Sequence, residues 1–359
     1  MTDQIHFTIK PEQLAVLGKI SGLPLSPVSP FRYGKETDTA AGIAQLAALG
    51  ICDTGGTIAA DKKDAVSALA LAEAFTRIYL TTPQRVIEYI AYCAPDGKTV
   101  GVTNDSGMQL VTYPAPNDAM LELVRHTIGF SRLRSIPFAA KLNRAETLVF
   151  SAMIDLQRKE MLRKFADGKT ADRLAVSGKE VLEMLKVPPG NIRWLSSAFA
   201  DLFTQAHVVK PGDTAGIFSS LAAKGLITES GKAYSLSDES VILARSHLMP
   251  SMYLTLTTGK GQPSGKTNIT GFSCIISGVQ DLLYIDYLAD NVELETVSSA
   301  AIHEYVKTFL TDRSVLAAMD AIPAAPSAAG KQERHFCPQC GASHKPGLKF
   351  CRQCGAKIT

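Results

Sequence analysis

Four cysteines near the end of the chain have the spacing of a zinc site. Cys337 and Cys340 form one C-x2-C pair, Cys351 and Cys354 form a second, and each pair follows a Phe and precedes a Gly. A C-x2-C turn presents two thiolates from one tight loop, and four thiolates complete the tetrahedral shell that Zn²⁺ prefers. We therefore predict a zinc ribbon over residues 335–359 in which these four cysteines hold one structural zinc ion. A segment this small cannot bury a sufficient core, so the metal should supply its folding free energy.

The other residues with reactive side chains form no recognisable catalytic motif. Cys52, Cys93 and Cys274 lie far apart in apolar stretches without a Cys-His signature, so we expect buried thiols. The histidines of the body are scattered along the chain: His6, His126, His207, His247 and His303. No H-E-x-x-H or G-x-S-x-G motif occurs, and we predict no enzymatic activity, no catalytic residues and no cofactor besides zinc. Unpaired thiols and a thiolate zinc site favour a reducing, cytoplasmic location.

A Gly-rich segment, residues 259–267 with the sequence GKGQPSGKT, is similar to a nucleotide-binding loop. The P-loop needs four residues between its first Gly and the Gly-Lys pair, whereas Gly259 leaves five before Gly265 and Gly261 leaves three. No apolar helix is expected after Thr267. A nucleotide-using enzyme is therefore only the weakest of three functional hypotheses.

Charge is divided unevenly between the body and the end of the chain. The chain carries a formal net charge of +3, and the residues from Lys331 onward contain six Lys or Arg against Glu333 alone. The end therefore carries +5, which leaves −2 for the body. A nearly neutral body does not favour binding to phosphate backbones. No apolar run has the length of a membrane span, and we expect neither a span nor a classical export signal.

The body contains an apparent internal duplication. In chain order the matched segments are 46–51 with 221–226, 79–81 with 253–255, and 110–112 with 294–296, at offsets of 175, 174 and 184. The change of offset is explained by an extra loop over residues 259–268 in the second copy. Residues 319–330, rich in Ala, Pro, Ser and Gly, are expected to form a flexible linker before the ribbon.

Each copy is expected to contain a helix-turn-helix with a small wing-like hairpin, an antiparallel β-meander and a closing helix. Helices are predicted over 40–50, 62–75 and 117–128 in the first copy and over 214–225, 238–247 and 299–310 in the second. Strands are predicted over 86–92, 99–103 and 108–113, and over 271–277, 282–287 and 292–297. Between the copies, a helix is predicted over 144–165, with further helices near 178–185 and 191–206.

These elements predict an α+β fold with two lobes related by a pseudo-twofold axis, which could share one antiparallel sheet, and a C-terminal zinc ribbon. The predicted parts are a first α+β repeat (1–130), a helical connecting region (131–213), a second α+β repeat (214–312), a flexible linker (313–334) and the ribbon (335–359).

The order of small motifs at the beginning of the chain resembles one known family. In order, these motifs are Leu14-Ala15-Val16-Leu17, Gly22-Leu23-Pro24-Leu25, Pro27, Pro30, Gly34, the helix ending at Gly50, and Val111-Thr112-Tyr113-Pro114. They resemble the start of the EspG family of type VII (ESX) secretion chaperones, and the second copy resembles its closing half. The resemblance covers residues 7–310. It implies a cytoplasmic adaptor that shields the apolar tip of a helical secretion substrate. The helical region 144–206 and the ribbon depart from the family pattern.

The leading functional hypothesis is a protein-binding adaptor, similar to a secretion chaperone, that holds an apolar helix of a protein partner. The alternative is a winged-helix, zinc-ribbon protein that binds nucleic acid. The start of the second helix of each pair opposes that alternative. In the first copy it has mixed charge, Asp61-Lys62-Lys63-Asp64, and in the second copy it carries Asp238 and Glu239, which phosphate would repel. Two uses of the ribbon remain open, a nucleic-acid contact, which its six cations favour, and docking on protein. Docking is the expected use because the two aromatic residues, Phe336 and Phe350, flank the cysteine pairs instead of forming a stacking platform.

Overall fold

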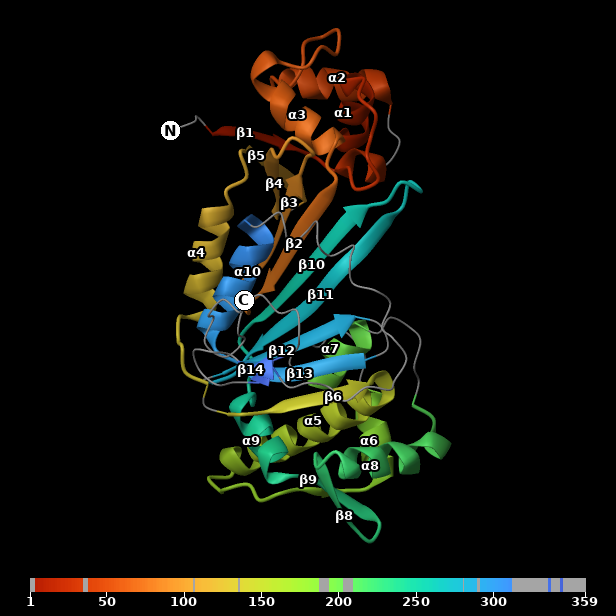
Figure 1. The fold of residues 1–359 in the computed structure, drawn as a ribbon, viewed down its shortest axis with the longest axis vertical. Coiled ribbons are helices and arrows are strands. Elements are labelled where there is room, and N and C mark those ends of the chain that lie inside the picture. The colour runs from red at the N-terminus through yellow and green to blue at the C-terminus, as the bar shows by residue number, and fades with distance from the viewer. Residues whose placement is uncertain are drawn as a thin grey trace.

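A ten-stranded antiparallel sheet forms the centre of the computed structural model, with strand order β1-β5-β4-β3-β2-β10-β11-β12-β13-β6 (Figure 1). The structure describes residues 4–34, 38–105, 107–134, 136–186, 194–202, 209–279, 281–288, 291–311, 335–336 and 343–344. The first half contributes β1 (Ile5–Ile9), β2 (Ala74–Thr81), β3 (Val86–Cys93), β4 (Thr99–Asp105) and β5 (Met108–Tyr113). The second half contributes β6 (Ala139–Asn143), β10 (Tyr253–Gly261), β11 (Thr267–Ser277), β12 (Leu282–Leu288) and β13 (Asn291–Val297).

The helices form two groups, α1–α3 and α5–α9, and one central pair, α4 with α10. The first half contains α1 (Gln13–Ser21), η1 (Pro30–Tyr33), α2 (Thr39–Ala48), η2 (Ala60–Lys62), α3 (Lys63–Ala70) and α4 (Asn117–Ile128). The second half contains α5 (Arg144–Ala166), α6 (Gly178–Leu185), α7 (Leu195–Leu202), η3 (Pro211–Asp213), α8 (Thr214–Ala223), α9 (Asp238–Ser246) and α10 (Ser299–Thr311). A small second sheet has the order β7 (Ala175–Val176), β9 (Ala233–Leu236), β8 (Ile227–Ser230). The predicted α+β fold class is confirmed.

The alternation of side chains along the strands shows which helices cover which face of the large sheet. On β2, Phe75 packs with the core under α1–α3, whereas Leu80 packs with α4 and α10. On β10, Tyr253 belongs to the core under α5–α9 and Leu254 to the core under α4 and α10. Tyr253 pairs with Thr81, which shares the face of Phe75 because successive side chains alternate. Hence α1–α3 and α5–α9 lie on one face, called face A, and α4 and α10 on the opposite face B.

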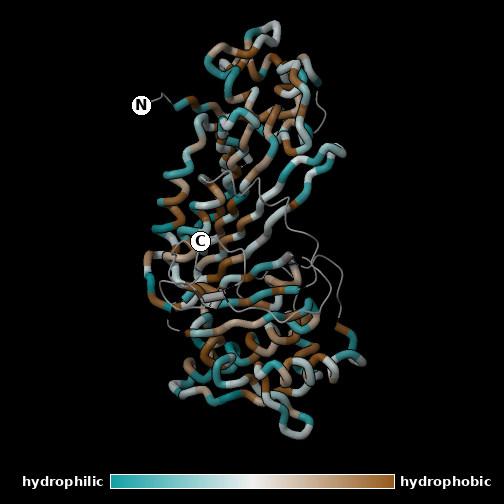
Figure 2. The backbone as a smooth tube through the Cα atoms, in the orientation of Figure 1, coloured by the Kyte–Doolittle hydropathy of each residue, from teal (hydrophilic) through white to brown (hydrophobic). Residues whose placement is uncertain are grey.

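Figure 1 shows this arrangement along the long axis of the molecule, with α1–α3 at one end, α5–α9 at the other, and α4 beside α10 against the middle strands. Hydrophobic residues recur along the central strands and along the helices packed on them, whereas the tip of the β10–β11 hairpin is more polar (Figure 2). The pattern agrees with burial of apolar area as the main stabilising contribution.

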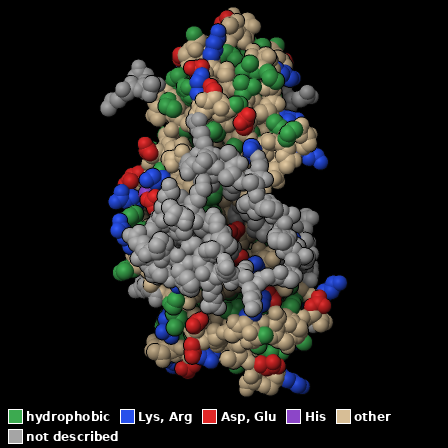
Figure 3. Space-filling model, in the orientation of Figure 1, with side chains coloured by type: hydrophobic (Ala, Val, Ile, Leu, Met, Phe, Trp, Pro, Cys, Tyr) green, Lys and Arg blue, Asp and Glu red, His purple; other side chains and the backbone are tan. Residues whose placement is uncertain are grey.

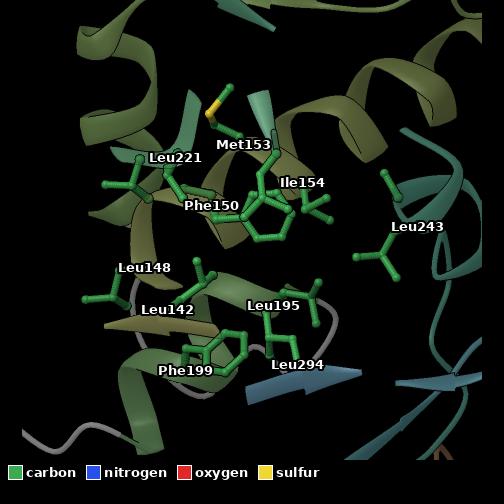
Figure 4. Packing of buried hydrophobic residues seen from close by; sticks show 14 of the residues in the cluster. Leu142, Leu148, Phe150, Met153, Ile154, Leu195, Phe199, Leu221, Leu243 and Leu294 are labelled. Atoms are coloured by element: carbon green, nitrogen blue, oxygen red, sulfur yellow. The ribbon is translucent and has the colours of Figure 1, made fainter. Parts of the chain in front are cut away.

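The core of the second lobe is built around α5. A capping box fixes the start of this helix, because the Asn143 side chain accepts from the Glu146 N–H and the Glu146 side chain accepts from the Asn143 N–H. Phe150 and Met153 of α5 belong to one buried cluster that also contains Phe199 of α7, Leu221 of α8 and Leu294 of β13 (Figure 4). The predicted connecting region and the predicted second repeat therefore share one hydrophobic core.

The two halves meet where β2 pairs with β10. Tyr79, Leu80 and Thr81 pair with Thr255, Leu254 and Tyr253 in antiparallel register, and these are the tripeptides that match at an offset of 174. Outward from this pair, each half presents four further strands in corresponding order, ending in β1 on one side and β6 on the other. The halves are thus arranged about a pseudo-twofold axis near the Leu80–Leu254 pair. The duplication of an ancestral unit stays a prediction.

Two segment predictions are wrong. The helix predicted to reach Phe75 ends at Ala70, and Phe75 lies in β2. The loop predicted over 259–268 is instead the end of a hairpin in which Gly259 pairs with Phe75 and with Ile269. In both places the local preference of the residues, for a helix before Phe75 and for a Gly-rich loop after Gly259, is weaker than the stabilisation from strand pairing between the halves. This pairing satisfies the backbone hydrogen-bonding groups of β2 and β10.

Candidate functional site

The predicted zinc ligands, Cys337, Cys340, Cys351 and Cys354, lie outside the described residues. Within the ribbon, the structure describes β14 (His335–Phe336) paired with β15 (Ser343–His344). In the sequence these strands bracket the first C-x2-C pair, which agrees with a hairpin that carries a zinc knuckle. Four thiolates suit a closed structural site, and their role as ligands stays a prediction. Among the described residues, no group of three His, Cys, Asp or Glu could hold a metal.

The lone cysteines and the body histidines are not brought together in the described part of the chain. Cys52 and Cys274 are buried in different cores, and Cys93 is half-buried. Burial raises the pKa of Cys274 to about 12, so this thiol stays protonated and unreactive near neutral pH. His207 lies outside the described residues.

The GKGQPSGKT segment forms the tip of the β10–β11 hairpin, and Thr267 begins a strand instead of a helix. A P-loop places its phosphates at a helix N-terminus, which this segment does not provide. The tip contacts the first lobe instead. The Thr267 hydroxyl donates to the carbonyl of Pro27 over 3.0 Å, and an Arg32 guanidinium N–H donates to the carbonyl of Gly265 over 3.3 Å.

The middle of face A, between the two helix groups, is covered by no described helix and is the candidate site. Tyr79 of β2 pairs with Glu88 of β3 on one side and with Thr255 of β10 on the other, so these three residues share face A. Arg77 lies two residues before Tyr79 on the same face, and Val86 lies two residues before Glu88. Tyr79 is 38% exposed and Val86 is 52% exposed. We call this set, which consists of Arg77, Tyr79, Val86, Glu88 and Thr255, the face A surface.

Polar contacts lie beside the exposed side chains of Tyr79 and Val86 on the face A surface. Arg77 forms an ion pair with Glu88, whose carboxylate also accepts from the Asn104 amide. The Arg77 guanidinium lies 5.8 Å from the centre of the Tyr79 ring, within reach of a cation–π contact. These contacts orient Tyr79 on a rigid sheet. A tyrosine held in this way offers large contact area at low entropic cost to an incoming protein surface.

A weak signal for this surface is present in the residue pattern, although the predicted helix over 62–75 obscured it. Residues 74–81 alternate between buried Ala74, Thr76, Ile78 and Leu80 and the more exposed residues between them. That alternation is typical of a strand. The same alternation places Arg77 and Tyr79 on the more exposed side of this strand.

Charged groups are dispersed over the described part of the molecule. Figure 3 shows Lys and Arg interspersed with Asp and Glu on the face that it presents, without a field of one sign. Local ion pairs such as Lys98 with Asp64 and Lys224 with Glu146 account for part of this mixing. No helix among the described residues has both the length and the apolar character needed to cross a membrane.

Comparison with known proteins gives a family match for the end of the chain and similarity to solved structures. Residues 336–358 match the family of zinc-ribbon domains, which confirms the predicted type of domain at this end of the chain. A comparison with curated proteins finds no match. Among solved structures, the chain is similar to the Mycobacterium tuberculosis type VII secretion system chaperone EspG5 in complex with a PE25-PPE41 dimer. That similarity has 10% identity and a TM-score of 0.46, and it covers 85% of this chain and 96% of that chain.

Proposed function

We propose that this chain is a non-catalytic adaptor that binds a protein partner on the face A surface and carries a structural zinc ribbon as a second contact. The observation that carries the proposal is the exposed Tyr79 beside the Arg77–Glu88 pair, in a part of the sheet over which the described helices do not extend. Tyr and Arg side chains are enriched at the energetically important centre of protein interfaces.

The proposed partner presents an apolar helix. Tyr79 and Val86 supply apolar contact area, and Arg77 and Glu88 can pair with charged residues at the border of such a helix. The resemblance of residues 7–310 to the EspG family makes a helical secretion substrate the first partner class to test, and a cytoplasmic location is part of the same proposal.

A pull-down with the full chain tests this function. Tagged wild type is compared with Tyr79→Glu and with the control Leu110→Glu in native lysate treated with nuclease. Leu110 is 39% exposed, nearly the same as Tyr79 at 38%, but lies on face B, because it pairs with Thr103 and Thr103 pairs with Tyr89. We expect one protein partner to copurify with the wild type and the control and to be lost with Tyr79→Glu.

Two results would contradict the proposal. Recovery of nucleic acid without protein would support the winged-helix alternative, which also predicts binding that weakens steeply with salt. Retention of the same partner by Tyr79→Glu at wild-type yield would exclude the face A surface as its binding site.

A further inference from the structure

A cavity of about 400 Å³ lies in the first lobe, away from the face A surface. It is bounded by the end of α1, by the turn that leads to Ile58, and by the first half of α3. Its apolar lining comes from Ile20, Leu23, Ile58 and Val66, and Lys63 is its one ionisable lining residue. Lys63 is exposed and takes part in no ion pair within the described part of the chain.

The backbone at the border of this cavity has an open hydrogen-bonding edge. Cys52 and Ile58 form a β-bridge, and the flanking hydrogen bonds run from Ala59 N–H to the carbonyl of Ile51 and from Asp53 N–H to the carbonyl of Thr57. Those bonds make Cys52 and Ile58 a non-hydrogen-bonded pair, so the N–H and C=O of Ile58 point away from Cys52. Neither group has a hydrogen-bond partner among the described residues.

The second lobe shows what occupies the corresponding place. There Ser237 N–H donates to the carbonyl of Leu226 over 3.0 Å, as Ala59 N–H donates to Ile51 in the first lobe, also over 3.0 Å. This correspondence makes Ile58 the counterpart of Leu236 of β9. On the outer edge of β9 lies β7, which pairs with the two residues before Leu236: Ala175 with Ser235, and Val176 with Tyr234. Val176 is buried in the lobe core.

The segment before and within β7 is held by α5, β9 and α9. These elements take the place of α1, the turn that leads to Ile58, and α3, which bound the cavity in the first lobe. Gln157 of α5 donates to the carbonyl of Asp172 and accepts from Leu174 N–H, over 3.0 and 2.8 Å. Arg173 forms an ion pair with Asp238 at the start of α9, and β9 provides the strand pairing. An extended chain thus lies against α5, β9 and α9.

The first lobe supplies no such segment from its own described residues. After Leu23 the chain runs past the C-terminal end of α3, where Ser26 N–H donates to the carbonyl of Ala70 over 2.9 Å. It then reaches the hairpin tip, where the Tyr33 hydroxyl contacts Thr267. In the second lobe the longer connection between α5 and α8 includes β7.

We propose that the cavity and the free edge at Ile58 bind an extended segment of a partner protein that adds as a strand to this edge. An apolar side chain of the segment enters the cavity, as Val176 enters the core of the second lobe. An acidic side chain lies beside Lys63, the reverse of the Arg173–Asp238 pair. This surface is separate from the face A surface, and it can fail or succeed independently of the proposed function.

The test uses the full chain and two synthetic peptides. One has the sequence of residues 171–178, ADRLAVSG, and the other carries glutamate in place of its arginine. The readout is exchange of the Ile58 amide hydrogen, measured by NMR with peptide at millimolar concentration. We expect the acidic peptide to slow this exchange by at least about tenfold, because the amide gains a hydrogen bond. Ser67→Trp, which fills the cavity, should abolish the protection.

Charge reversal and a modified peptide complete the experiment. Lys63→Glu should lower the affinity for the acidic peptide and raise the affinity for the arginine peptide, each by about three- to fivefold. Lys10→Glu, an equal change of charge elsewhere on the lobe, should leave both affinities unchanged. A peptide that is N-methylated at the amides that would pair with Ile58 should not protect the Ile58 amide of the wild-type chain. This comparison does not depend on the folding of any variant. Unchanged Ile58 exchange with the acidic peptide, or equal protection by the N-methylated peptide, would overturn the proposal.

Discussion

Asp155 and Arg158 form a fully buried ion pair that joins three parts of the second lobe. Their side chains are 2.6 Å apart, and Asp155 also accepts from Leu195 N–H and Ser196 N–H at the start of α7. Arg158 donates to the carbonyl of Leu248, beyond the end of α9. Burial raises the pKa of Asp155, and Arg158 with the amide donors acts in the opposite direction. The carboxylate is therefore best understood as the acceptor that fixes α7 on α5.

Asp155→Ala should lower the free energy of unfolding by about 3–5 kcal/mol, because it leaves the buried Arg158 charge without its partner. Urea unfolding followed by circular dichroism measures the effect. Asp238→Ala is a suitable control, since the Asp238 side chain is 87% exposed and its ion pair with Arg173 should contribute less than about 1 kcal/mol. A loss below 1 kcal/mol in Asp155→Ala would contradict this account.

His247 is buried in its neutral form in the second lobe. Its Nδ1 lies 2.7 Å from the Ser246 hydroxyl and 3.2 Å from the carbonyl of Leu243, and its Nε2 has no partner among the described residues. Burial lowers the pKa of His247 to about 4 from 6.5, with Arg158 acting in the same direction and Asp281 opposing it. The unfolded chain therefore binds a proton between these two pH values that the folded chain does not bind.

The stability contributed by neutral His247 should be complete above pH 6.5 and should be lost as the pH falls toward 4. The loss should reach about 3 kcal/mol, since one pKa unit corresponds to about 1.4 kcal/mol. Comparing urea unfolding from pH 7 to pH 4 for wild type, His247→Gln and His126→Gln tests this. The exposed His126 control should follow the wild-type slope, and His247→Gln should be flatter. Parallel curves for all three proteins would show that His247 is not the group responsible.

At the scale of elements, local signals predicted the helices well and the strands unevenly. The helix predicted over 144–165 is α5, Arg144–Ala166, because Asn143 and Glu146 form a capping box that is visible in the sequence. The helix over 117–128 agrees with α4. Strands β1, β2, β6 and β10 were not predicted. Each of them pairs with a strand from a distant segment of the chain, and β1 and β6 have only five residues each. Pairing partners far apart in the chain leave little local signal.

The face A surface depends on the same long-range information. Tyr79 belongs to the surface because none of the described helices extends over the middle of face A, a property of the assembled layers. The pattern of β2 indicates which side chains point outward, but it does not indicate what covers them. The zinc ribbon is the opposite case, because its four ligands lie within eighteen residues and their spacing alone predicts the metal site.

The ribbon should bind one zinc ion per chain and depend on it for folding. A chelator should release the metal and unfold residues 335–359, while circular dichroism of the large sheet stays unchanged, because we expect residues 313–334 to form a linker between the two folds. Atomic absorption on the full chain measures the stoichiometry. Cys337→Ser should remove the zinc, whereas the control Cys52→Ser, far along the sequence, should retain it. Zinc retained at one ion per chain in Cys337→Ser would exclude this ligand.

At the scale of the whole molecule, the continuous sheet makes the two halves one unit of folding. The β2–β10 pair and the contact of the hairpin tip with Pro27 and Tyr33 both cross between the halves. The central core also contains residues of both, including Leu80 and Leu254. Opening either half would expose the backbone hydrogen-bonding groups and the apolar side chains of the other.

Thermal unfolding of the body should therefore be a single transition in calorimetry. Leu254→Ala, at a position with 0% exposure, should lower the free energy of unfolding by about 2–5 kcal/mol and move the whole transition, because the cavity lies between both halves. Leu110→Ala, at a half-exposed position, should have a smaller effect. Two separate transitions in which Leu254→Ala shifts only one would contradict this view of the sheet.

The β2–β10 pair also has a consequence for synthesis on the ribosome. Strands β1–β5 can pair with one another once α4 has emerged, but β2 then ends this partial sheet with bare amides and carbonyls until residues 253–261 have been translated. During this interval the nascent chain displays an unprotected edge to other nascent chains, and such edges promote aggregation. A pause in translation between α4 and β10 would lengthen the exposure, whereas fast elongation through the second lobe would shorten it.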